Sequence, residues 1–135
     1  MKRAFAAGSV YFMAVFAVGF CLGVVRTLVL LPLVGEVLAI AIELPIILAL
    51  AWLICVRILR RVPLSFTEAG VMGATAFALL MLGEAAISIL LGGRSLAGHV
   101  ALYAEAPHLL GLAGQVVFAL FPMIRTRRMR SLSTI

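Results

Sequence analysis

The chain has 135 residues, of which 65% are apolar and 12% are charged, and its mean hydropathy is +1.26. It contains no Asp, no Asn and a single Gln. A soluble domain of this size needs a polar surface that this composition does not supply, so a soluble globular fold is excluded and an integral membrane protein is favoured. At about 20 residues per spanning helix, the length allows four spans and no separate soluble domain.

The net charge of +6 comes from 11 basic and 5 acidic residues. Basic clusters beside apolar runs orient a membrane protein and contact anionic headgroups at its cytoplasmic face. A nucleic-acid-binding protein needs a polar face that presents its cations together, and this sequence has none. We therefore expect the lipid bilayer, and not nucleic acid, as the partner. Nine of the basic residues form three such clusters: Lys2 and Arg3; Arg57, Arg60 and Arg61; Arg125, Arg127, Arg128 and Arg130.

The first predicted span covers about residues 4–25. Its basic start resembles a signal peptide, but the apolar run is too long and lacks a small-x-small cleavage site at its end, so we expect a retained helix. Residues 26–36 form a short apolar connection in which Pro32 and Gly35 favour a turn. The second predicted span covers about 37–56 and ends at an arginine cluster.

Ser65 to Glu68 have the pattern of a capping box, which predicts the start of a third span at about 67–91. In the more polar loop that follows, Leu96, Val100 and Tyr103 are spaced as on a helix, which predicts a short amphipathic segment. The fourth predicted span covers about 107–124. We expect the basic tail, 125–135, to be disordered beyond its first few residues.

This arrangement places nine basic residues on the inside and two, Arg26 and Arg94, on the outside. The opposite orientation would reverse that ratio, against the usual excess of cations on the cytoplasmic side. The sequence therefore predicts an all-α integral membrane four-helix bundle, a single domain over residues 1–135 with both termini inside. We expect it in a bacterial cytoplasmic (inner) membrane.

Three of the predicted spans carry a polar side chain at nearly the same depth. Glu43, Glu84 and Gln115 lie six to eight residues from the outer ends of their spans, which at 1.5 Å per residue is about 10–12 Å. A charged side chain within a bilayer costs roughly 2.5–3.5 kcal/mol on insertion scales, so each glutamate needs a partner or a function. The long side chain of Arg26 could reach this layer. We therefore predict a polar cluster of Arg26, Glu43, Glu84 and Gln115 that faces the bundle interior.

Two neighbouring residues extend this hypothesis. Glu36 lies one heptad before Glu43 and offers Arg26 a second partner nearer the surface. Pro45 has no backbone N–H, so it frees the carbonyl of Ala41 and is expected to kink the second span. Unpaired backbone at this depth must face protein or a water-filled cavity.

The cluster has two interpretations that the sequence leaves open. Buried polar pairs hold membrane helices together, which would suit a non-enzymatic accessory or assembly component. A carboxyl group without a cation partner favours its protonated form in lipid and could carry protons. That property would suit a small oligomeric proton-coupled transporter or channel that uses Glu43 and Glu84. Catalytic motifs and metal-ligand spacings are absent, so we expect no enzyme activity, no cofactor and no metal site.

Small residues four apart predict close helix packing, because they let helix backbones approach. Such contacts could form within one bundle, with a second copy, or with another membrane subunit. The residues concerned are Gly19 and Gly23 in the first span, Gly70, Ala74 and Ala78 in the third, and Gly111 in the fourth.

A set of short motifs extends over most of the chain: Gly19 and Gly23 followed by Arg26, Pro32 followed by Gly35 and Glu36, Glu43 with Pro45, and Glu84 in the third span. In these motifs the chain resembles a group of small bacterial inner-membrane proteins that have no assigned function. The resemblance implies a four-helix bundle and brings no particular activity with it.

Overall fold

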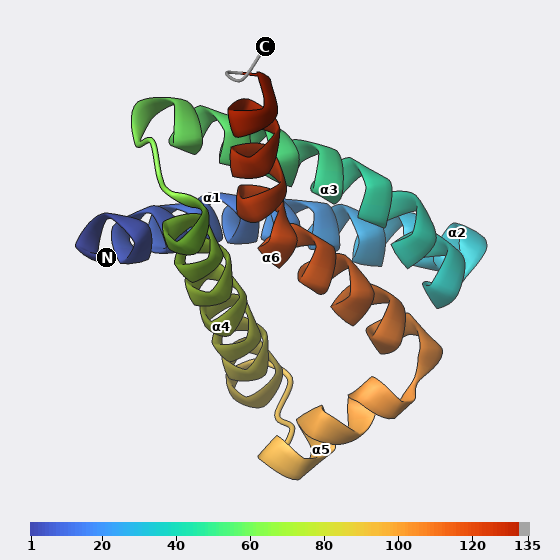
Figure 1. Ribbon diagram of the computed structural model, residues 1–135. Coiled ribbons are helices and arrows are strands. Elements are labelled where there is room, and N and C mark those ends of the chain that lie inside the picture. The colour runs from blue at the N-terminus through green and yellow to red at the C-terminus, as the bar shows by residue number, and fades with distance from the viewer. Residues whose placement is uncertain (133–135) are drawn as a thin grey trace.

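The computed structural model describes residues 1–132, which form helices joined by short connections, and four of the helices are long and apolar enough to cross a membrane (Figure 1). The predicted helical class and the four long apolar helices are thus confirmed. The elements in chain order are α1 (Lys2–Val25), the π-helical turn η1 (Arg26–Leu30), α2 (Leu31–Val34), α3 (Glu36–Arg61), α4 (Phe66–Leu90), α5 (Leu96–Ala101), the 3-10 turn η2 (Leu102–Ala104) and α6 (Ala106–Leu132).

Two segments are more helical than the sequence led us to expect. The connection after α1 stays helical to Val34 and turns at Gly35, whose φ of +80° is a conformation that glycine adopts readily. Pro32 lies at the start of α2, directly after the π-helical turn η1, and the helix continues through it. α6 also continues through the basic segment to Leu132, since arginine is a strong helix former. Residues 133–135 of the predicted tail lie outside the described residues.

The predicted capping box begins α4. The Ser65 hydroxyl oxygen accepts a hydrogen bond from the Glu68 backbone N–H (3.2 Å), and a Glu68 carboxylate oxygen accepts one from the Ser65 N–H (2.9 Å). The amino group of Met1 lies 3.5 Å from the Glu68 carboxylate, so the chain starts beside the first turn of α4.

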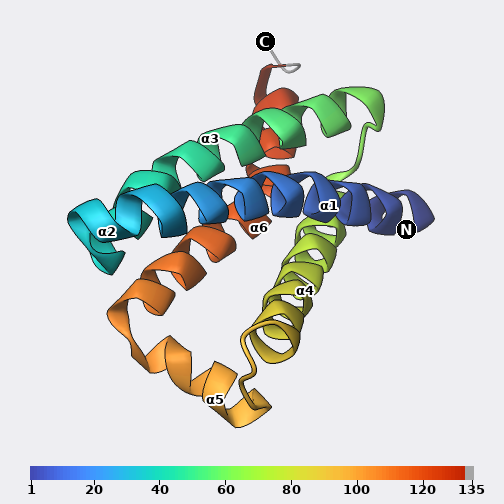
Figure 2. The same ribbon diagram turned by 180° about the vertical axis from the view of Figure 1, so that it is seen from behind.

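The long helices form two antiparallel hairpins, α1 with α3 and α4 with α6, which pack side by side (Figure 2). Around the bundle the order is α1, α4, α6, α3, so α3 and α4 lie diagonally opposite although only four residues join them. α4 runs away from α1 and α3 toward α5, so that α2 and α5 end far apart (Figures 1 and 2).

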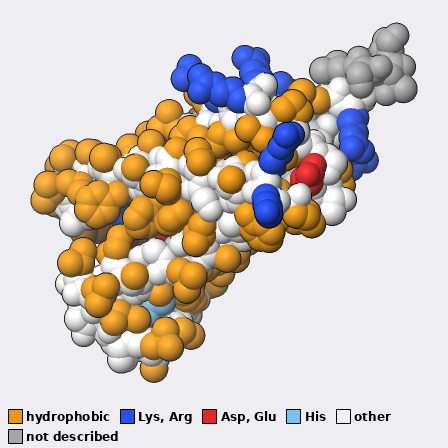
Figure 3. Space-filling view, turned by 90° about the vertical axis from the view of Figure 1, so that its left-hand side faces the viewer, with side chains coloured by type: hydrophobic (Ala, Val, Ile, Leu, Met, Phe, Trp, Pro, Cys, Tyr) orange, Lys and Arg blue, Asp and Glu red, His pale blue; other side chains and the backbone are white. Residues whose placement is uncertain are grey.

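We call the end formed by the starts of α1 and α4, the end of α3 and the C-terminal part of α6 the basic end, because most Lys and Arg residues lie there. The half of the bundle away from it is the distal half. In the space-filling view the Lys and Arg side chains gather at one end of the molecule, and the rest of that face is largely apolar (Figure 3).

The helices approach most closely in the half toward the basic end. A Cβ added to Gly8 of α1 would lie 2.7 Å from the Met72 carbonyl oxygen of α4. A Cβ on Gly73 of α4 would overlap the Ala119 carbonyl oxygen of α6. The fully buried side chains of Tyr11, Cys55, Leu59 and Met72 fill the same half. Backbones in contact, with large side chains around them, therefore close this part of the bundle.

The predicted small-residue stripe of α4 does not pack within the bundle. Ala74 and Ala78 are exposed, and a Cβ added to Gly70 would make only an ordinary contact with the Met123 sulfur (3.6 Å). The glycines of α4 that lie closest to neighbouring helices are Gly73 and Gly83. Because α4 is apolar all round, its sequence has no polar face that would reveal which side points inward.

The predicted small residues of α1 and α6 differ in how closely they approach other helices. Gly19 lies against Ile47 of α3, where an added Cβ would be 2.9 Å from the side chain. Gly23 has no close neighbour on another long helix, and Gly111 has no neighbour within 4 Å of an added Cβ. The close contact on α6 is instead at Gly114, which faces Leu44.

One hydrogen bond crosses the bundle from α1 to α6. Pro122, inside α6, has no N–H, so the carbonyl of Phe118 four residues earlier loses its usual helical partner. The hydroxyl of Tyr11 donates a hydrogen bond to that carbonyl (3.2 Å), and the Tyr11 and Phe118 rings stack at 4.4 Å. Tyr11 is fully buried. The unpaired carbonyl of one hairpin is thus satisfied by the other.

We expect Tyr11→Phe to lower the free energy of unfolding by about 1–2 kcal/mol, because the Phe118 carbonyl is left buried without a donor. The same substitution in a Pro122→Ala background should cost clearly less, because the alanine restores the helical N–H. Thermal or denaturant unfolding in mild detergent measures both values. Equal costs in the two backgrounds would show that the hydroxyl does not compensate for the proline.

Candidate functional site

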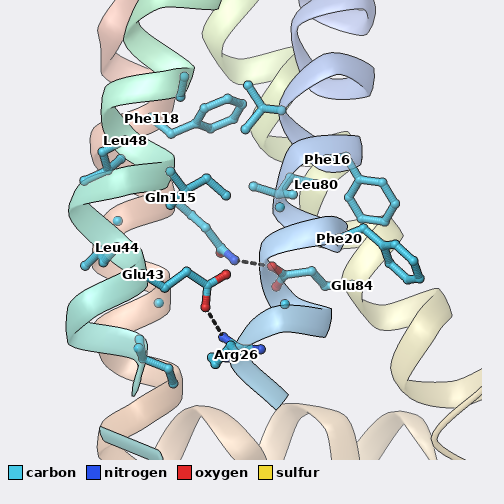
Figure 4. A pocket seen from close by; sticks show the side chains of 18 of the residues that line it. Phe16, Phe20, Arg26, Glu43, Leu44, Leu48, Leu80, Glu84, Gln115 and Phe118 are labelled. Atoms are coloured by element: carbon cyan, nitrogen blue, oxygen red, sulfur yellow. Dashed lines mark hydrogen bonds and ion pairs between the residues drawn. The ribbon is translucent and has the colours of Figure 1, made fainter. Parts of the chain in front are cut away.

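A cavity of about 540 Å³ lies in the distal half, between the long helices (Figure 4). Most of its lining is apolar, and it includes the aromatic rings of Phe16, Phe20 and Phe118. In the space-filling view the molecule is hollowed on the side away from the basic end, with basic and acidic side-chain atoms inside the hollow (Figure 3). Arg26, Glu43, Glu84 and Gln115 all line this cavity.

The first polar pair in the cavity joins η1 to α3. Arg26 begins η1, where its carbonyl accepts from the Leu31 N–H, one residue further along than in an α-helix. Its Nη1 lies 3.0 Å from Oε2 of Glu43, an ion pair whose alignment is not that of a hydrogen bond. The Glu43 side chain is 10% exposed, and that of Arg26 is 36% exposed. A buried carboxylate is therefore balanced by a cation that remains partly accessible.

The second polar pair joins α6 to α4. Nε2 of Gln115 donates a hydrogen bond to Oε1 of Glu84 (2.6 Å). The other end of the amide, Gln115 Oε1, is buried without a hydrogen-bond partner. Within residues 1–132 Glu84 has no ion pair, so its neighbour is a neutral amide and not a cation. The two glutamates of the cavity thus differ in charge compensation (Figure 4).

A group of aromatic and imidazole side chains lies behind Glu84. The His99 ring, 8% exposed, meets Tyr103 edge to face at 5.6 Å, and Tyr103 meets His108 at 6.4 Å. Nδ1 of both histidines is buried without a hydrogen bond, although His108 Nδ1 lies 3.8 Å from the Glu105 carboxylate. Both histidines and Arg26 are within electrostatic range of Glu84.

Tyr103 stays a neutral phenol near pH 7, because burial raises the pKa of its hydroxyl and the Glu84 carboxylate raises it further. The hydroxyl contacts the Met81 sulfur at 3.9 Å. The sequence predicts a short helical segment that includes Tyr103, but it does not reveal the approach of Tyr103 and His99 to Glu84. That approach depends on α5 and η2 turning back beside α4 and α6, which no local pattern encodes.

Glu36 and Pro45 stand apart from the cavity. Glu36 is exposed in the first turn of α3, and among the described residues it forms no ion pair with Arg26. Pro45 is exposed on α3, which continues as one helix through it. Neither residue lines the cavity. Pro122, in the other hairpin, is the proline that leaves a carbonyl, that of Phe118, to pair with a side chain.

Comparison with protein-family models, with curated proteins and with solved structures finds no match for this chain. The resemblance stated from the short motifs therefore stays a prediction. Among residues 1–132, no three His, Cys, Asp or Glu side chains lie close enough together to hold a metal ion.

We expect Arg26→Met to lower the free energy of unfolding by about 1–3 kcal/mol, because it leaves Glu43 buried without its cation. Replacing both partners, with Arg26→Met and Glu43→Met together, should restore most of the loss, since two apolar side chains leave no charge to compensate. Unfolding in mild detergent measures the double-mutant cycle. If the two single losses simply added, the ion pair would not be the reason for the effect.

Proposed function

We propose that this chain is an integral membrane protein that crosses a bacterial inner membrane four times with both termini in the cytoplasm. Its four long helices have the required length and hydropathy, and its basic residues gather at one end. Large apolar side chains point outward around the bundle, which suits lipid and not water. Those more than 60% exposed include Met13, Leu28, Leu33, Leu82, Leu90 and Leu91.

Reporter fusions test this topology. A periplasm-active reporter fused after Arg61 should be silent, and the same reporter fused after Arg94 should be active, because these positions follow the second and third spans. Cytoplasm-active reporters at the same positions provide the matched control. The reverse pattern would contradict the orientation, and equal signals at both positions would contradict the spans.

We further propose that the protein binds a small ligand in its cavity and couples that binding to a proton on Glu84, as in a small proton-coupled transporter or channel. The observation that carries this proposal is a cavity of ligand size with one glutamate, Glu84, that has no cation partner among the described residues. Pockets of about 300–1,000 Å³ with few polar groups are typical small-molecule sites. An ionisable residue within a membrane helix marks a functional site by default.

The chemistry follows from the different surroundings of the two glutamates. Glu43 is held by Arg26 and acts as a fixed charge. Glu84 can be neutralised by a proton or by a bound ligand, but not by both at once, so binding and deprotonation are coupled. Release on the other side requires a second conformation or a second copy, because the tightly packed half toward the basic end closes the cavity there.

The accessory or assembly role remains the second candidate. The specific observation that favours it is the exposed small-residue face of α4, with Ala74 and Ala78, which another membrane helix could pack against. Under this interpretation the two polar pairs only hold helices together. Gentle purification at native expression separates the two roles, because an accessory subunit should co-purify with a larger complex.

Proton coupling is tested in proteoliposomes that enclose a pH-sensitive dye. Cationic, anionic and neutral solutes are added outside in turn, and we expect at least one to change the interior pH. Glu84→Gln should abolish the change, while Glu68→Gln should leave it intact. Gln can still pair with Gln115, and the capping box accepts Gln as well as Glu at position 68, so both variants should fold.

Size-exclusion elution in detergent checks that the variants are folded. If no solute and no imposed membrane potential drives a Glu84-dependent change in interior pH, the transport proposal is wrong. A change that persists in Glu84→Gln would also overturn it, because the coupled proton would then lie elsewhere.

A further inference from the structure

We propose that the ligand of this cavity is a lipophilic cation, a bulky apolar molecule with one positive charge that pairs with Glu84. This inference rests on the proposed function and names the substrate class of the same site. Three features of the cavity carry it: the charge of its lining, the kind of polar atom left without a partner, and its apolar walls.

The charges of the lining leave one negative charge without compensation. The lining contains one basic residue, Arg26, and two acidic residues, Glu43 and Glu84. The ion pair of Arg26 with Glu43 cancels one positive and one negative charge at 3.0 Å. Within residues 1–132, the only hydrogen-bond partner of the remaining carboxylate is the Gln115 amide. In surroundings of low dielectric, a lone carboxylate attracts a cation strongly and repels an anion.

The polar atoms without partners in this cavity are acceptors. Among the described residues that line the cavity, Gln115 donates its N–H group to Glu84, which leaves its carbonyl Oε1 buried without a hydrogen-bond partner. Glu43 Oε2 is also an acceptor, and its partner is the Arg26 cation. An anion or another acceptor would face these oxygens with no donor between them. The donors that remain on Arg26 belong to a side chain that is 36% exposed and already directed at Glu43. The interior of the cavity therefore suits a positively charged ligand.

The walls determine what kind of cation fits. A small hydrated ion would lose its water among apolar side chains and find one carboxylate in return, which is a poor exchange. A bulky organic cation instead buries its apolar body against the walls and keeps its charge at Glu84. The rings of Phe16, Phe20 and Phe118 add attraction for a cation over their faces. The volume of about 540 Å³ is that of a site for a molecule with several rings.

The groups around Glu84 make binding of a cation sensitive to pH. Gln115 and His108 face it from α6, His99 from α5 and Arg26 from η1, and Tyr103 of η2 lies between the two histidines. As the pH falls, Glu84 takes up a proton, and the loss of its negative charge opposes a bound cation. When the cation binds, the proton on Glu84 passes to solvent. The affinity for the cation should therefore decrease as the pH is lowered, and binding of the cation should release protons.

Two probes of equal size and opposite charge test the proposal on the full-length protein in detergent. Tetraphenylphosphonium is a lipophilic cation, and tetraphenylborate is an anion of the same shape. By calorimetry, with titrations into empty micelles subtracted, the cation should bind more tightly than the anion. Its affinity should also be lower at lower pH. Glu84→Gln should lower the affinity for the cation at least about tenfold and raise the affinity for the anion, while Glu68→Gln should change neither affinity.

The opposite responses of the two probes separate a charge effect from misfolding, because misfolding would weaken the binding of both probes. Tighter binding of the borate, or a cation affinity that Glu84→Gln leaves unchanged, overturns the inference. The proposed function fails separately: if an anionic or neutral solute alone drives the Glu84-dependent change in interior pH, the transport role stands and the cation class is wrong. If no solute does so, the transport proposal falls as well.

Discussion

The carbonyl of Phe118 must find a hydrogen-bond donor in a part of the bundle where no water-facing surface can supply one. Pro122 removes the helical donor, and the Tyr11 hydroxyl replaces it from the opposite hairpin. The same contact stacks the Tyr11 and Phe118 rings, so the orientation of the hydroxyl and the packing of the two helices are fixed together. The hairpins are joined there and approach closely at Gly8, and the two helices of the second hairpin approach closely at Gly73, so the bundle is closed toward its basic end. The cavity is left to the other half, where α4 leaves α1.

This division of the bundle gives its two halves different physical characters. Near the basic end, small residues allow close approach and large apolar side chains fill the remaining space. In the distal half the helices separate, and Glu43, Glu84 and Gln115 lie around the space between them. A carboxylate in such a place is stable only with a partner, which Glu43 has in Arg26. Glu84, paired with an amide, keeps a charge that a proton or a ligand can satisfy.

Depth along a helix can be read from the sequence, whereas rotation about its axis cannot. Counting residues from the span ends placed Glu43, Glu84 and Gln115 in one layer, and the structure places all three around one cavity. The same counting could not show that Ala74 and Ala78 face outward, because α4 is apolar on every side. Pro45 and Pro122 look alike in the sequence, yet only the second frees a carbonyl that meets a hydroxyl. Such meetings depend on which helices become neighbours.

Each polar pair of the cavity joins helices of the same hairpin, Arg26 to Glu43 in one and Gln115 to Glu84 in the other. Contacts between the hairpins at this level are apolar, such as Gly83 against Phe16 and Gly114 against Leu44. Apolar contacts have no preferred direction and can slide with little loss, whereas the polar pairs resist distortion. The two hairpins should therefore separate more easily at the cavity, where their contacts are apolar, than at Tyr11, where a hydrogen bond joins them.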